Sequence, residues 1–216
     1  MKTTITFLAA ALLLVGTTQA QDDPKSKAIL DKLVEKNKGY TSFEATFTSR
    51  LQNKEDGLDV KQSGKAQVRG KKFRLQLDDN TIMMDGTTMW TYSKESNEVT
   101  ISDPSEMDQE MDPSKLFTQY ETGFKSAFVE ERKEATGQVL QVIKLFPLEP
   151  AKKAFHTVML TIDKATSEPR EVKVMYKEGN IVTYTLQKFT PNVSLPESTF
   201  TFDKSKYPGV EVNDMR

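Results

Sequence analysis

The sequence predicts a mainly β fold of the α+β class, built on one antiparallel sheet of about ten or eleven short strands. Apolar residues alternate with polar ones over most of the chain, as at Phe43, Ala45 and Phe47. Turn sequences such as Asp85-Gly86 separate these runs. Helical spacing of apolar residues is confined to two short segments, so we expect a sheet with one apolar and one solvated face.

The first twenty residues have the pattern of a secretory signal peptide. Lys2 provides a positive charge, residues 5–15 are almost wholly apolar, and Thr18-Gln19-Ala20 resembles a cleavage site. The apolar run is short for a membrane-spanning helix, although an uncleaved N-terminal anchor is the alternative. Together with the absence of cysteine, the pattern indicates a bacterial periplasmic protein. We expect residues 1–20 to be removed near Ala20 and residues 21–216 to form one domain.

A helix is expected directly after the signal peptide. Pro24 suits a first helical turn, and Gly39 suits a C-terminal stop. Between them the apolar residues recur at helical spacing: Ile29, Leu30, Leu33 and Val34.

Strands follow the helix in sequence order, with turn residues such as Glu178-Gly179-Asn180 between them. The alternating pattern predicts strands over these ranges: 43–51, 58–68, 73–77, 90–92, 99–101, 139–146, 156–162, 172–176, 181–186 and 199–202.

A second, short helix interrupts the strands between residues 103 and 123. Asp112 is a good N-cap, and Pro113 fits the first helical position. Leu116, Phe117 and Tyr120 then form an apolar stripe. This stripe suits a lid over the apolar face of the sheet, and an ordinary core helix is the alternative.

Composition excludes several classes of function. Lys plus Arg number 30 and Asp plus Glu 31, so no basic excess is available to attract nucleic acid. The absence of cysteine excludes disulfides, thiolate metal sites and a cysteine nucleophile. The single histidine, His156, leaves little material for a catalytic triad or a metal centre. We therefore expect no cofactor, no bound metal and no enzymatic activity.

The acidic residues allow two further interpretations. The stretch 103–112 is rich in Asp and Glu but lacks the glycine and the final glutamate of a calcium loop, so we interpret it as a solvated loop. Carboxylate pairs of the glycosidase kind are not singled out by any spacing. A secreted hydrolase on a β scaffold is therefore the alternative from another functional class.

The two expected helices are too few to cover a wide sheet completely. A curved, partly covered sheet retains an apolar hollow, and such a hollow on a secreted protein indicates a ligand site. Nine methionines, several of them in or beside strands, are typical of adaptable apolar surfaces, although core packing explains any one of them equally well.

Four segments resemble the LolA-type outer-membrane lipoprotein carriers. Residues 85–92 resemble that family's DG-x-x-x-W-x-Y hairpin, and residues 43–47 resemble its first strand after an N-terminal helix. Residues 64–75 resemble a strand pair in which an arginine precedes Phe-Arg, and residues 200–212 resemble its F-x-F and P-x-G-V ending. One departure is Gly70, which follows Arg69 where family members usually have proline.

The resemblance implies an open antiparallel half-barrel whose apolar concave face is covered by the N-terminal helix and a short lid helix. It also implies that an arginine latches the lid, and this arginine falls at Arg69, for which an ordinary surface charge on a strand is the alternative. Leu116, Phe117 and Tyr120 suit that lid. The residues expected to line a cavity for acyl chains are Phe43, Phe47, Phe73, Leu75, Trp90, Tyr92, Val158, Leu160 and Tyr184.

The same resemblance implies a function and its partners. It implies a periplasmic chaperone, monomeric and without a cofactor, that shuttles lipoproteins from the inner to the outer membrane. Expected partners are acylated lipoproteins, the inner-membrane ABC transporter that releases them, and an outer-membrane acceptor where one exists. A lipid- or lipoprotein-sensing regulatory module of the same fold is the alternative within binding proteins.

Overall fold

The computed structural model describes residues 23–107, 112–115, 120 and 122–216. Within these residues the chain forms one α-helix and one sheet of twelve strands. The bounds are α1 Pro24–Lys38, β1 Ser42–Asn53, β2 Leu58–Arg69, β3 Lys72–Leu77, β4 Asn80–Met84, β5 Met89–Ser93, β6 Glu98–Ser102, β7 Phe124–Lys133, β8 Val139–Pro147, β9 Phe155–Asp163, β10 Pro169–Tyr176, β11 Ile181–Pro191 and β12 Glu211–Asp214. The signal-peptide region and the lid residues Leu116 and Phe117 lie outside the described residues.

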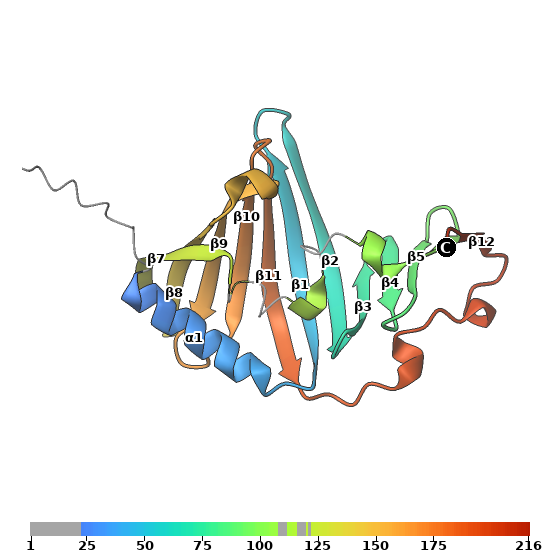
Figure 1. The fold of residues 1–216 in the computed structure, drawn as a ribbon, viewed down its shortest axis with the longest axis horizontal. Coiled ribbons are helices and arrows are strands. Elements are labelled where there is room, and N and C mark those ends of the chain that lie inside the picture. The colour runs from blue at the N-terminus through green and yellow to red at the C-terminus, as the bar shows by residue number, and fades with distance from the viewer. Residues whose placement is uncertain (1–22, 108–111, 116–119, 121) are drawn as a thin grey trace, which may run out of the picture.

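The sheet is open, with β1 near its centre (Figure 1). Its strand order is β12-β6-β5-β4-β3-β2-β1-β11-β10-β9-β8-β7, and the two outermost strands do not pair with each other. All neighbours are antiparallel except β12, which runs parallel to β6. The predicted class, a mainly β protein with an open half-barrel, is confirmed, with twelve strands instead of ten or eleven.

Helix α1 forms where the sequence predicts it. Asp23 caps it by accepting the backbone N–H of Lys25 at 2.8 Å, and its other carboxylate oxygen accepts the N–H of Phe128 on β7 at 2.9 Å. The Ser26 hydroxyl bonds that of Ser126 at 2.8 Å. The four predicted apolar residues, Ile29, Leu30, Leu33 and Val34, are all buried. One carboxylate therefore both starts the helix and fixes it to the edge of the sheet.

The two faces of the sheet carry different side chains. The cavity face carries Ala45, Phe47 and Leu51 of β1, and the outer face carries the side chains that alternate with them. Side chains of α1 join the buried cluster on the cavity face with Ile143, Leu145, Val158 and Leu160. The helix thus covers the β8 and β9 part of that face and leaves the central strands to be covered by other elements (Figure 1).

The C-terminal segment forms a second apolar cluster on the outer face. Tyr92 of β5 packs against Phe202 and Tyr207, with ring centroids 6.1 and 4.4 Å apart. Phe200 is completely buried. Both faces of the sheet are therefore apolar around β5, unlike the single apolar face that the sequence predicts.

Four strand assignments differ from the prediction. β4 is not predicted because its apolar residues Ile82, Met83 and Met84 are consecutive and give no alternation. Residues 199–202 are not a strand, since the chain forms a short 3-10 helix at Glu197–Thr199 and then continues irregularly. β7 is not predicted because a bulge between Phe128 and Glu130 interrupts its alternation and its second half is charged. β12 is not predicted because all four of its residues are exposed, so burial leaves no pattern.

The turn after β9 depends on a buried carboxylate, Asp163, which is 4% exposed. Burial alone would raise its pKa. Hydrogen bonds from Gln138, the Thr166 N–H and Arg170 outweigh burial and lower the pKa from 3.8 to about 2. The carboxylate therefore stabilises the fold above the unfolded pKa, and this stabilisation is lost as pH falls through the folded pKa.

We expect Asp163→Asn to lower the free energy of unfolding at pH 7 by about 2 kcal/mol, the equivalent of this pKa shift. The difference between the variant and the parent should shrink between about pH 4 and pH 2. Urea denaturation at several pH values measures this. A difference that does not depend on pH over this range would contradict the assignment.

Candidate functional site: an apolar cavity on one face of the sheet

A cavity of about 360 Å³ lies on the cavity face of the central strands. Its size falls within the range typical of small-molecule sites. Side chains from five strands line it, and most are apolar: Ala45, Phe47, Leu51, Val60, Ala66, Leu75, Leu77, Val172, Val174, Val182 and Leu186.

Small residues in register make the floor of this cavity hollow. Ala45 of β1 lies directly opposite Ala66 of β2, and Phe47 lies opposite Gly64. A Cβ atom at Gly64 would lie 2.3 Å from Cζ of Phe47, so the phenyl ring occupies the space that a side chain at Gly64 would need. The ring consequently lies across β2, and its edge meets Tyr184 with centroids 6.1 Å apart. Gly64 therefore creates the space in which Phe47 lies down on the sheet.

Described residues between β6 and β7 also line the cavity. Asp112, Pro113 and Tyr120 all line it. Asp112 accepts the N–H of Ser114 at 2.9 Å, at the start of a 3-10 helix over Pro113–Lys115. The predicted cap and first position of the inserted helix are confirmed, and the described part of that helix is a single 3-10 turn.

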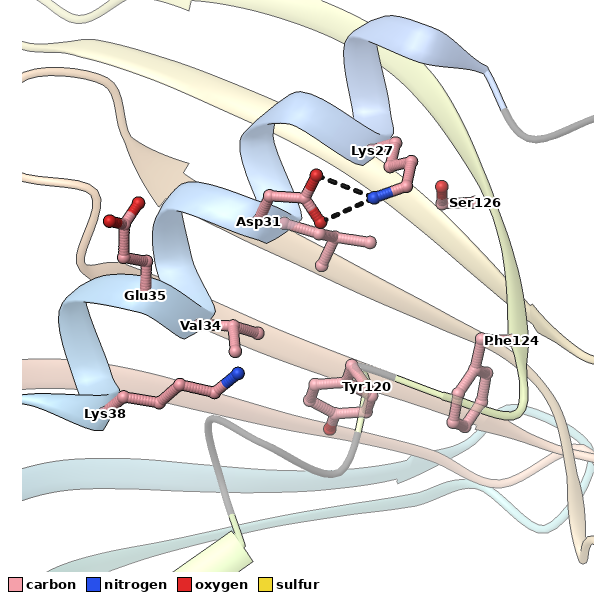
Figure 2. Close-up of a pocket in the computed structure, with 9 residues that line it drawn as sticks. Lys27, Asp31, Val34, Glu35, Lys38, Tyr120, Phe124 and Ser126 are labelled. Atoms are coloured by element: carbon pink, nitrogen blue, oxygen red, sulfur yellow. Dashed lines mark hydrogen bonds and ion pairs between the residues drawn. The ribbon is translucent and has the colours of Figure 1, made fainter.

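Tyr120 also lines a second cavity, of about 330 Å³, between α1 and β7 (Figure 2). The rim of this second cavity on α1 is charged, and Lys27 and Asp31 form an ion pair there at 2.7 Å. Tyr120 is 6% exposed and packs edge to face on Phe124, with centroids 5.7 Å apart. Tyr120 therefore lies in the wall between a polar cavity under the helix and an apolar one over the central strands.

The structure places the predicted cavity residues in three groups. The first group, Phe47, Leu75 and Tyr184, lines the cavity. The predicted lid residue Tyr120 lines it as well. The second group belongs to the buried cluster beside the cavity and consists of Phe43, Phe73, Val158 and Leu160. Val158 and Leu160 are 1% exposed because α1 packs over their part of the face.

The prediction is wrong for the third group, Trp90 and Tyr92, which lie outside the cavity. Met84 of β4 pairs with Met89, and Met83 pairs with Trp90, so Trp90 and Tyr92 point to the outer face. The C-terminal segment covers that face near Tyr92. Alternation locates the two faces of a strand, but it does not say which of two apolar faces holds the cavity.

Trp90 is the only tryptophan, so tryptophan fluorescence tests whether it lies outside the cavity. We expect acyl ligands to leave its emission unchanged, because it lies on the opposite face from the cavity. In a Trp90→Phe background, a tryptophan substituted for Phe47 should shift its emission to the blue when a ligand binds. A large response of Trp90 in the parent protein would place the ligand on the outer face.

Arg69 has different partners from those that a lid latch requires. It alternates with Val68 and so lies on the outer face. Its guanidinium donates to the carbonyl of Leu195 at 2.5 Å, pairs with Glu197 at 2.5 Å and lies 5.0 Å from the ring centre of Phe200. Among the described residues these contacts hold the C-terminal segment, so the predicted latch role is corrected to a clasp on that segment.

Lys72 completes the clasp. Its ammonium group binds Glu197 at 2.7 Å, and together with Arg69 it holds the pKa of that carboxyl below its usual value.

Several further cavity residues are absent from the prediction, although the same alternation contains them. Leu51 lies on the same face of β1 as Phe47, and Val182 and Leu186 lie on the same face of β11 as Tyr184. Ala45 and Ala66 line the cavity through their small size, a property that hydrophobic patterning does not reveal.

His156 is exposed, and no group of three or more His, Cys, Asp or Glu in the described part of the chain could hold a metal ion. No helix in that part is long and apolar enough to cross a membrane.

Comparison with known proteins gives a family and a fold. The family model of the outer membrane lipoprotein carrier protein LolA matches residues 38–203. No curated protein matches the sequence. An uncharacterized conserved protein from Thermus thermophilus has a similar structure, with a TM-score of 0.56 and 15% identity over 88% of this chain and 99% of that one. Lipoprotein LppX from Mycobacterium tuberculosis has a TM-score of 0.51 and 16% identity over 81% and 100%. At such identities the two structures show a shared fold.

Proposed function

This chain belongs to the LolA family of outer membrane lipoprotein carriers, and we propose that it binds the acyl chains of lipoproteins and carries them between membranes. The observation that carries the proposal is the apolar cavity on the central strands, with its mostly aliphatic lining. Each buried methylene contributes about 0.8 kcal/mol, so a long acyl chain gains substantial free energy there. The chain acts as a carrier and makes or breaks no covalent bond.

A carrier must also release its cargo, so part of the favourable free energy of acyl binding has to be offset. The segment that carries Asp112, Pro113 and Tyr120 lies against the cavity, and a bound acyl chain competes with it for the same apolar surface. Tyr120, with Leu116 and Phe117 of the same segment, is the proposed lid. Exposure of its apolar side chains on opening offsets part of the gain from the acyl chain.

The proposed partners follow from this route. The chain is exported to the periplasm by residues 1–20, receives acylated lipoproteins from the inner-membrane ABC transporter that releases them, and delivers them to an outer-membrane acceptor. N-terminal sequencing of the secreted protein tests the first step, with a mature N-terminus at Gln21 expected.

The binding step is tested with a synthetic diacylated lipopeptide and its non-acylated counterpart. We expect the acylated form alone to displace a fluorescent fatty acid, and native mass spectrometry to show one lipopeptide per chain. Transfer of the lipopeptide from inner-membrane to outer-membrane vesicles then separates a carrier from a sensor. Equal displacement by the non-acylated peptide would overturn the proposal, and binding without transfer would indicate the sensing module.

A further inference from the structure

Three polar side chains form a row across the floor of the apolar cavity. Ser49 of β1 pairs in register with Gln62 of β2 on one side and with Tyr184 of β11 on the other. All three side chains line the cavity, and all three are partly buried. Cross-strand neighbours lie about 5 Å apart, so the three groups can act on one ligand.

This row interrupts the apolar lining on both sides. The adjacent row on one side is Gly64, Phe47 and Leu186, and on the other side it is Val60, Leu51 and Val182. Packing alone would favour apolar residues in the middle row as well, since burying polar groups without partners is costly.

None of the three side chains makes a hydrogen bond to another described residue, and their polar atoms are open to the cavity and not fully buried. The outer face of the same strands behaves differently, since Arg50 there binds Asp59 through two hydrogen bonds. Burial raises the pKa of Tyr184, so its phenol keeps its proton at neutral pH. The row therefore offers an amide N–H, a hydroxyl and a phenol as donors.

We propose that Gln62, Ser49 and Tyr184 form a polar rung that binds the carbonyl group of an ester or amide joining an acyl chain to its carrier group. The donors are all neutral, which suits a neutral carbonyl acceptor. This inference rests on the proposed function and specifies which part of the lipid is recognised.

The test compares two lipids that differ only in the carbonyl. Dipalmitoylglycerol has two ester carbonyls, and dihexadecylglycerol has ether links in their place. Displacement of a fluorescent fatty acid gives both affinities. Since a neutral hydrogen bond changes an equilibrium about three- to tenfold, we expect the parent protein to prefer the diester by about tenfold.

The triple variant Gln62→Leu, Ser49→Ala, Tyr184→Phe should bind both lipids equally, at the parent's affinity for the diether. Tyr184→Phe alone, which keeps the ring, should lose about threefold of the preference and remains informative if the triple variant does not fold. Ser63→Ala, on the outer face beside Gln62, is the matched control and should keep the full preference.

The outcomes separate the inference from the proposed function. If neither lipid binds to the parent protein, the proposed function fails and the rung fails with it. If both bind with equal affinity, the carrier function stands and the rung is overturned. A preference for the diester that survives in Tyr184→Phe and in the triple variant also overturns it, because the carbonyl is then recognised elsewhere.

Discussion

Gly64→Ala is expected to weaken acyl binding at least tenfold while the sheet remains folded. The added Cβ would lie 2.3–2.9 Å from three atoms of the Phe47 ring, much closer than such atoms pack. The ring is the movable partner, and the cavity is the open space beside it. It must therefore rise from the floor into the volume that an acyl chain would fill. Loss of a few buried methylenes at about 0.8 kcal/mol each produces an effect of this size.

A second substitution should reverse the effect. Phe47→Leu removes the ring that Gly64→Ala displaces, so the double variant is expected to recover most of the parent affinity. Displacement of a fluorescent fatty acid measures affinity, and thermal unfolding checks that each variant is folded. Gly39→Ala is the matched control, since Gly39 has a φ of −81° and the nearest atom to its added Cβ is a backbone oxygen at 3.4 Å. Affinity that stays unchanged in Gly64→Ala, or that Phe47→Leu does not restore, would contradict the role of this pair.

The parts of the molecule that local physics determines could be predicted from the sequence. Helix α1 is predicted to within a residue, because Pro24 and its four apolar residues act through contacts within a few turns. The central strands are predicted because one apolar face gives a clear period of two. The cavity lining is partly predicted, as at Phe47 and Tyr184, because these residues follow the same alternation.

The remainder depends on contacts between distant parts of the chain. The C-terminal segment covers the outer face near β5 and so makes both faces apolar, which reverses the expected orientation of Trp90. Arg69 is one of several strand cations in the sequence, and only the fold brings it to Leu195 and Glu197. Family resemblance identifies such an arginine but does not specify its partner in this chain. The space above Gly64 is likewise a property of a cross-strand pair.

Phe200→Ala is expected to produce the largest loss of stability, about 3–5 kcal/mol, because a fully buried phenyl ring is replaced by a cavity. The effect should be concentrated in the C-terminal segment, where hydrogen exchange in residues 195–214 and in β6 should accelerate. β6 is included because β12 at the end of this segment pairs with it. Arg69→Leu removes the clasp on the same segment and should lower the free energy of unfolding by about 1 kcal/mol. Hydrogen exchange should accelerate in the same residues as in Phe200→Ala.

At temperatures where Phe200→Ala and Arg69→Leu are folded, the acyl affinity of each variant should remain within about twofold of the parent's affinity. Neither substitution changes a residue of the acyl site, so the binding free energy should not change. Phe200 and Arg69 act on the outer face, whereas the acyl site is built from Phe47 and its neighbours on the other side of the sheet. Side chains on the two faces of a strand are separated by the backbone itself, so a change on one face reaches the other only if the strand moves. A tenfold loss of affinity in folded Arg69→Leu, comparable to that expected for Gly64→Ala, would show that the clasp controls the cavity and would restore a gating role to this arginine.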